Sequence, residues 1–139
     1  MDHAMGAGVR LSSLVGGRAE LCGSEATLSE AAQAMVNAST GSLGVIQGRD
    51  LVGLITERDL LRAVAEGTDV STASVGQWMS SEPDTVSPDV EVEEAARWLL
   101  EAGYRHLPVM EDGQLLGIVS IRDLLWAILA PETEPPEIH

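Results

Sequence analysis

The chain has 139 residues, a length that allows one compact domain or two very small fused units. Apolar residues make up 45% and charged residues 22%, which excludes a disordered or fibrous chain, and 8 basic residues against 22 acidic ones give a net charge of −14. Every one of these basic residues is Arg. The chain therefore lacks both the basic stripe of a nucleic-acid or membrane binder and the Lys of Walker-type nucleotide hydrolases.

The sequence also predicts flexible ends for the chain, and its single cysteine predicts the cellular compartment. Residues 1–8 are predicted to be a flexible N-terminus or a cloning remnant, and residues 131–139 a flexible acidic tail. Cys22 has no second cysteine to pair with, and no secretory signal pattern precedes it, so we expect a cytoplasmic, reducing compartment. No apolar run reaches the roughly 18 residues of a membrane span.

An internal repeat determines the predicted organisation. Gly53–Leu61, GLITERDLL, aligns without a gap with Gly117–Leu125, GIVSIRDLL, at an offset of 117 − 53 = 64 residues. The same offset pairs like residues through the segments that precede both motifs. We therefore predict repeat 1 over residues 9–70 and repeat 2 over residues 71–130.

Repeat 1 contains the patterns of two helices and a hairpin. Apolar residues at helical spacing from Leu28 to Val36 follow a capping box of Thr27 and Glu30, which predicts an amphipathic helix. Two short β-prone runs follow, separated by the polar residues 48–50, and a second helix ends before Gly67. The predicted elements are a helix from Leu28, strands 43–47 and 51–56, and a helix over 57–66.

Repeat 2 follows the same pattern, and Asp112-Gly113 between two apolar runs is a strong hairpin signal. An apolar strand position precedes the first helix of each repeat, at Cys22 and at Val86. Because Cys22 matches a Val position, a structural role is favoured over a nucleophilic one. The predicted elements of repeat 2 are a helix from Val92, strands 107–111 and 114–120, and a helix over 121–130.

The predicted fold is therefore α/β (α+β), with a β-α-β-β-α unit used twice. A repeat of about 50 ordered residues buries too little surface to be stable alone. We expect the two repeats to pack about a pseudo-two-fold axis, with clefts between them in two quasi-equivalent copies.

Each junction between the last strand and the last helix carries a hydroxyl followed three residues later by a carboxylate, Thr56 with Asp59 and Ser120 with Asp123. One interpretation is a helix N-cap, worth about 1 kcal/mol. The other is a nucleotide site, because free first-turn N–H groups bind anions and a nearby carboxylate accepts ribose hydroxyls. Arg58 and Arg122 stand in the first turn, where the helix dipole disfavours a cation, and this favours the second interpretation.

These motifs, together with Arg105-His106-Leu107-Pro108-Val109, resemble the cystathionine β-synthase (CBS) domain family, whose domains occur in tandem pairs called Bateman modules. The resemblance covers residues 9–130. It implies an adenosine ligand such as AMP, ADP, ATP or S-adenosylmethionine bound in clefts between the repeats. It also implies a regulatory role towards an effector protein that the sequence does not identify, with no catalytic residue.

Carried over by position, the resemblance assigns three kinds of contact to this chain. Asp59 and Asp123 bind the ribose, and Leu54 and Ile118 line the adenine pocket. The expected phosphate contacts are Thr56, Ser120, Arg105 and His106, with the first-turn Arg58 and Arg122 beside them. The expected ligand is an adenine nucleotide, AMP or ATP, and no cofactor or metal is expected, since the three histidines lie far apart without cysteine partners.

Repeat 1 departs from this pattern. Gly41 and Ser42 replace the basic pair of repeat 2, and Glu57 places a negative charge near the expected phosphates. We therefore expect the site around Asp123 to bind anions better. The alternative function is a dimeric structural or interaction scaffold whose ligand pockets have decayed.

Two tryptophans suggest self-association. Trp98 lies on the polar side of its helix, opposite Ala95 and Leu99, and Trp126 takes the place of Arg62. Large aromatic side chains on a polar face are typical of interfaces. We expect a homodimer formed through helix faces that include both tryptophans.

Overall fold

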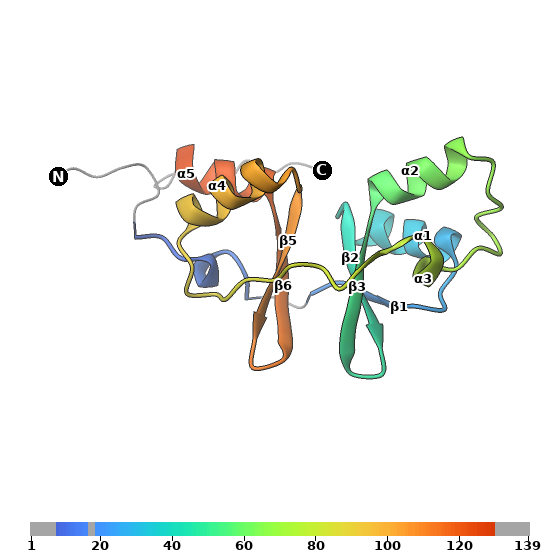
Figure 1. The fold of residues 1–139 in the computed structure, drawn as a ribbon, viewed down its shortest axis with the longest axis horizontal. Helices are drawn as coiled ribbons and strands as arrows, with labels where there is room; N and C mark the ends of the chain where they lie inside the picture. Colours follow the sequence, from blue (N-terminus) through green and yellow to red (C-terminus); the bar gives the residue numbers. More distant parts are fainter. Residues whose placement is uncertain (1–7, 17–18, 130–139) are drawn as a thin grey trace. The chain divides into compact units, whose positions relative to one another are not determined.

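The computed structural model describes residues 8–16 and 19–129, and the chain divides into two compact units (Figure 1). The first-repeat unit spans residues 19–83. The second-repeat unit combines residues 84–129 with the N-terminal segment 8–16. The predicted tails lie outside the described residues, except for Gly8.

The first-repeat unit is a four-stranded sheet with order β1-β2-β3-β4, accompanied by three helices. β1 is parallel to β2, and the other neighbouring strands are antiparallel. The predicted hairpin and both predicted helices are confirmed, whereas α3 and β4 were not predicted. The elements are β1 (Leu21–Gly23), α1 (Leu28–Ala38), β2 (Ser42–Gln47), β3 (Asp50–Thr56), α2 (Glu57–Ala65), α3 (Val75–Trp78) and β4 (Ser80–Ser81).

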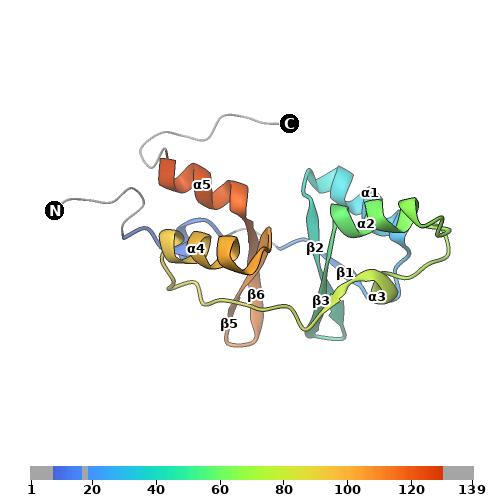
Figure 2. The ribbon, with the colours of Figure 1, turned by 45° about the horizontal axis from the view of Figure 1, so that its top comes forward.

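The second-repeat unit contains a two-stranded antiparallel sheet and two long helices. Asp112 and Gly113 both have positive φ, 53° and 80°, which is the turn geometry that an Asp-Gly hairpin requires. Helices α4 and α5 pack against each other beside this hairpin (Figure 2). The elements are η1 (Leu11–Ser13), α4 (Val92–Ala102), β5 (His106–Glu111), β6 (Gln114–Ser120) and α5 (Ile121–Leu129).

The two hairpins match each other residue for residue at the offset of 64. Val45 pairs with Gly53 as Val109 pairs with Gly117, and both hairpins have a register shift directly after this pair. The sequence repeat is therefore also a structural repeat.

The first strand of repeat 2 differs from the predicted pattern. Cys22 lies in β1, but Val86 forms only an isolated parallel bridge to Val109. In repeat 1 the neighbouring hydrogen bonds run from Ser24 N to Ile46 O (3.2 Å) and from Gly44 N to Glu20 O (2.9 Å). The residues that correspond to Ser24 and Gly44 are Pro88 and Pro108, which have no N–H to donate, so the strand is reduced to one bridge.

Local interactions begin and end the helices as their sequences require. The predicted capping box is confirmed: Glu30 N donates to Thr27 Oγ1 (3.1 Å), and Thr27 N donates to Glu30 Oε1 (2.9 Å). α4 ends at Gly103, whose left-handed conformation closes the helix. The longest described helices, α1 and α4, have 11 residues each, and none of the described helices is long and apolar enough to cross a membrane.

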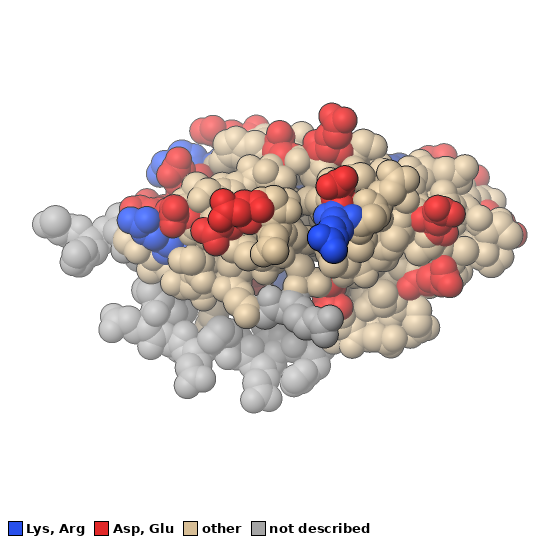
Figure 3. All heavy atoms as spheres, turned by 90° about the horizontal axis from the view of Figure 1, so that it is seen from below, with Lys and Arg blue, Asp and Glu red and all other residues tan. Residues whose placement is uncertain are grey.

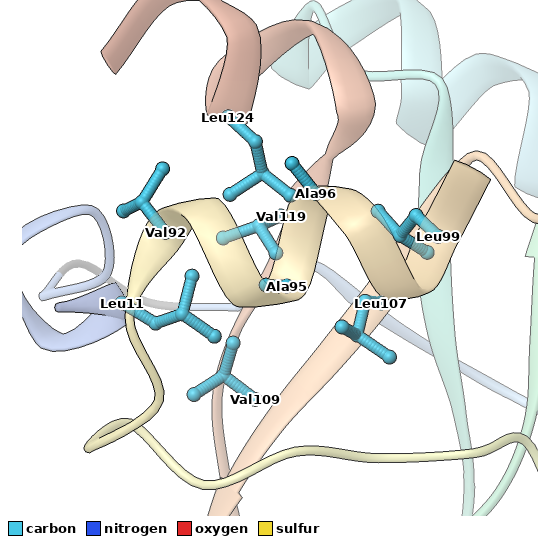
Figure 4. Packing of buried hydrophobic residues seen from close by; sticks show 9 residues of the cluster. All are labelled: Leu11, Val92, Ala95, Ala96, Leu99, Leu107, Val109, Val119 and Leu124. Carbon is cyan, nitrogen blue, oxygen red and sulfur yellow. The ribbon is translucent and has the colours of Figure 1, made fainter. Parts of the chain in front are cut away.

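Each unit has its own aliphatic core. In the second-repeat unit, the buried face of α4 lies on the inner side chains of the hairpin and on Leu124 of α5 (Figure 4). Leu11 of η1 completes this core and is fully buried. In the first-repeat unit, Val75 of α3 holds the corresponding position and is also fully buried.

Candidate functional site

In the second-repeat unit, the predicted hydroxyl and acid meet at the start of α5. Asp123 N donates to Ser120 Oγ (3.1 Å), and Ser120 N donates to Asp123 Oδ2 (2.9 Å). The junction is therefore a capping box, as the first interpretation of the motif predicts. Asp123 is nevertheless exposed, and no ion pair joins it to another described residue. Part of its carboxylate remains available to accept further hydrogen bonds.

The hairpin brings the predicted basic pair to this junction. His106 is the register partner of Ser120, and Ile121 N donates to Arg105 O (2.9 Å). Residues 105 and 106 thus lie directly across from the first residues of α5. The structure gathers four predicted site residues, Arg105, His106, Ser120 and Asp123, within one unit.

The arginines near the motifs do not pair with acids of the described chain. Arg105 and Arg122 are exposed and form no ion pair there, and the same holds for Arg49 and Arg58. Acidic side chains are spread over the face drawn in Figure 3, where basic ones are sparse. Unpaired guanidinium groups therefore offer an anion local attraction on a chain whose overall charge is repulsive.

In the first-repeat unit the corresponding acid is enclosed. Asp59 is 6% exposed, and its Oδ2 accepts from Thr56 N (2.8 Å) and Thr56 Oγ1 (3.0 Å). Arg62 Nη2 lies 3.3 Å from Asp59 Oδ1. The guanidinium of Arg62 also lies over the ring of Trp78, 5.6 Å from its centroid. Both carboxylate oxygens of Asp59 are therefore engaged within the protein.

The first junction also carries a negative charge where the second junction carries a positive one. Glu57 N donates to Gly41 O (2.9 Å), the counterpart of the bond from Ile121 to Arg105. A Cβ placed on Gly41 would lie 3.0 Å from Glu57 Oε1, so a carboxylate lies where repeat 2 begins its Arg side chain. The prediction of a negative charge at this position is confirmed. That the first junction binds a phosphate less well than the second stays a prediction.

The two predicted adenine-lining residues occupy equivalent strand positions. Leu54 on β3 pairs with Gly44 and is buried, and Ile118 on β6 pairs with Pro108 and is half-buried. Their contact with a base stays a prediction.

The remaining candidates have mainly structural surroundings. Burial raises the pKa of the half-buried Cys22 thiol to about 11, which keeps it protonated and unreactive at neutral pH. Among the described residues no group of three or more His, Cys, Asp or Glu side chains could hold a metal ion. Trp98 is 38% exposed, and its ring lies 5.8 Å from the ring of Tyr104, centroid to centroid, at a tilt of 44°.

Sequence reasoning overlooked Arg62 and Trp78 as part of the first junction. The spacing of Asp59 and Arg62, three residues apart on a helix, is the signal that predicts their pairing. No local pattern predicts Trp78, because it lies in the short helix α3, 78 − 62 = 16 residues after Arg62.

Comparisons with known proteins identify the repeats. The CBS domain family model matches residues 20–66 and 75–130. An uncharacterized 17.7 kDa protein of Acidianus ambivalens is 42% identical over 109 residues, covering 77% of this chain and 65% of its own length. The CBS domain protein PAE2072 from Pyrobaculum aerophilum, solved in complex with AMP, is 31% identical, with a TM-score of 0.78 over 88% of this chain and 97% of its own.

A second solved structure, CBSX2 in complex with AMP, is 27% identical, with a TM-score of 0.73 over 91% of this chain and all of its own. The chain spans 52% to 65% of the length of three curated relatives that it matches.

Proposed function

The chain belongs to the CBS domain family, and we propose that its tandem repeats form a non-catalytic regulatory module that binds an adenine nucleotide, AMP or ATP. Two similar solved structures contain AMP, which supports an adenosine ligand for this chain. CBS domains are generally regulatory. The output of this module would therefore be a change in its own assembly or in an effector protein.

The observation that carries this proposal is the arrangement at the start of α5. The exposed carboxylate of Asp123 can accept hydrogen bonds from the vicinal hydroxyls of a ribose. The hydroxyl of Ser120 and the guanidinium groups of Arg105 and Arg122 can bind a phosphate beside it. Ile118 is the proposed adenine contact of this junction, and His106 is a further phosphate contact. Leu54 and Arg58 hold the equivalent positions at the first junction.

The proposal is tested by thermal unfolding with AMP, ADP, ATP and S-adenosylmethionine. A ligand at a hundred times its Kd stabilises the folded state by about 2.7 kcal/mol. For a domain of this size the corresponding rise in Tm is several degrees. The variants Asp123→Ala and Arg105→Ala should each lose most of that rise.

Arg97→Ala is the matched control. Arg97 is exposed on α4 and pairs with Glu93 at 3.9 Å, so its removal also deletes a surface guanidinium. It should leave the ligand-induced rise unchanged. Salt should weaken ATP binding more than adenosine binding, because only ATP uses the charged contacts. An unchanged Tm with every ligand would contradict the sensor function and favour the scaffold.

We also propose that the chain forms a homodimer through its helices. Large apolar side chains remain exposed on the helices of both units: Leu61 and Val64 on α2, Trp98 and Leu100 on α4, Leu125 and Leu129 on α5. Contact with a second copy would remove this apolar surface from water. Sedimentation should give about twice 14.7 kDa, and Trp98→Glu should lower that mass towards the monomer's. Trp126 is the other proposed interface residue, and a monomer at every concentration would contradict the dimer.

A further inference from the structure

We propose that Arg62 closes the Asp59 carboxylate to a ribose, so that each chain binds its nucleotide through Asp123 and keeps the Asp59 motif unoccupied. This inference rests on the proposed function and deepens it. It assigns to Arg62, a residue outside the CBS motifs, control over how many nucleotides the chain binds.

Contacts within the protein engage both carboxylate oxygens of Asp59. Oδ2 accepts two bonds from Thr56, and Oδ1 faces the guanidinium of Arg62 at 3.3 Å. The side chain of Asp59 is 9% exposed. A carboxylate binds the two hydroxyls of a ribose as a hydrogen-bond acceptor, so Arg62 competes with these hydroxyls for Oδ1 of Asp59.

Arg62 is held in place from a second side. Its guanidinium lies 5.6 Å from the centroid of the Trp78 ring, within the range of a cation–π interaction. Displacing Arg62 from Asp59 therefore disturbs two interactions at once. Since the Arg62 side chain is 51% exposed, water screens its ion pair with Asp59, so the closure can be removed without loss of the fold.

The second junction lacks this closure. Trp126 stands where repeat 1 has Arg62 and carries no charge to pair with Asp123. Asp123 accepts one hydrogen bond from Ser120 N, and the hydroxyl of Ser120 donates none to it. The same motif is thus open in one unit and closed in the other, and the residue three positions after the acid makes the difference.

A purely structural role for Arg62 predicts a different behaviour. In that case, the Asp59–Arg62 ion pair would only stabilise α2 slightly, as such pairs three residues apart do, and would not affect ligand binding. Removal of Arg62 would then lower the stability and leave the number of bound nucleotides unchanged. The number of bound nucleotides therefore separates the two roles.

The experiment is titration calorimetry of the full chain with AMP. Wild type should bind about one equivalent per chain, with Asp123→Asn abolishing it. Arg62→Met keeps a long unbranched side chain at this position and removes the charge. It should add a second binding event, which Asp59→Asn in the same chain should remove. Arg97→Met, which removes the Arg of the Arg97–Glu93 pair on α4, should match wild type. Circular dichroism establishes that each variant is folded, and Arg62→Gln replaces Arg62→Met if the latter is not.

The reciprocal variant tests the closure at the other junction. Trp126→Arg places a cation three residues after Asp123 and should weaken AMP binding by roughly tenfold or more. If wild type binds AMP and Arg62→Met gives the same isotherm, the inference about Arg62 is wrong and the proposed function stands. The same holds if wild type shows two equal sites and Asp59→Asn removes one of them. Absence of AMP binding in wild type and in Arg62→Met would overturn the proposed function and this inference together.

Discussion

Two glycines of the repeated motif are required by close packing. A Cβ on Gly53 would lie 2.8 Å from the carbonyl oxygen of Ser80, and a Cβ on Gly117 would lie 2.7 Å from Cγ1 of Val15. Val15 and the segment before β4 occupy corresponding places in the two units, since 15 + 64 = 79 and Met79 directly precedes Ser80. The glycines therefore let a distant segment, at Val15 in one unit and at Met79 and Ser80 in the other, lie on the hairpin.

We predict that Gly53→Ala destabilises the protein by about 1–3 kcal/mol, because the backbone carbonyl of Ser80 cannot move away from the added methyl group. Gly117→Ala should cost less, since the side chain of Val15 can shift. Gly23→Ala is the control, because a Cβ there meets nothing within 4 Å. Urea unfolding measures all three, and an equal loss of stability in Gly23→Ala and Gly53→Ala would contradict the packing argument.

The helices that follow the first strand of each repeat differ at their N-termini. Thr27 caps α1 with a complete capping box, whereas Glu91 precedes α4 without a side-chain cap. The residue at the third helical position is Glu in both, Glu30 and Glu94. Repeat 2 thus has half of a capping box.

Completing that box should stabilise the protein. Glu91→Thr supplies the missing hydroxyl to the N–H of Glu94 and should raise the free energy of unfolding by about 0.5–1 kcal/mol, while Thr27→Ala should lower it by about 1 kcal/mol. Glu91→Ala removes the same charge without adding a hydroxyl. It should therefore leave the free energy of unfolding no higher than in wild type. Thermal unfolding checks the three variants, and equal stability of the Thr and Ala variants at position 91 would refute the cap.

At the scale of the whole molecule, each core includes a residue from the N-terminal segment of the other predicted repeat. Leu11 lies in the core of the second-repeat unit, and Val75 lies in the core of the first-repeat unit. The repeat boundary predicted at residue 70 stays a prediction about sequence units. The compact units divide instead at residues 83 and 84.

A fragment of residues 19–83 should therefore retain more native structure than one of residues 9–70. The shorter choice removes Val75, whose N–H donates to Ala26 O (2.8 Å), and leaves the core of the first repeat open on one side. Far-UV circular dichroism with urea titration compares the two. If the isolated fragment of residues 9–70 unfolded as cooperatively as the fragment of residues 19–83, α3 and β4 would be dispensable for the fold.

The sequence by itself determined the elements whose signals are local. The capping box at Thr27, the Asp112-Gly113 turn and the helical spacing of the apolar residues predicted α1, the second hairpin and the cores, because these patterns act within a few residues. The repeat located both junctions and predicted the better anion site at Asp123. The nucleotide contacts themselves remain predictions that the binding experiments test.

Only the tertiary structure decided the state of each junction and the partners of each core. Asp59 and Asp123 have the same motif, yet Asp59 is enclosed by Arg62 and Trp78, and Trp78 arrives from a helix that no local pattern links to α2. The reduction of the first strand of repeat 2 likewise depends on which residues lie beside Pro88 and Pro108. Contacts between segments distant in sequence depend on the path of the whole chain, and local propensities do not encode that path.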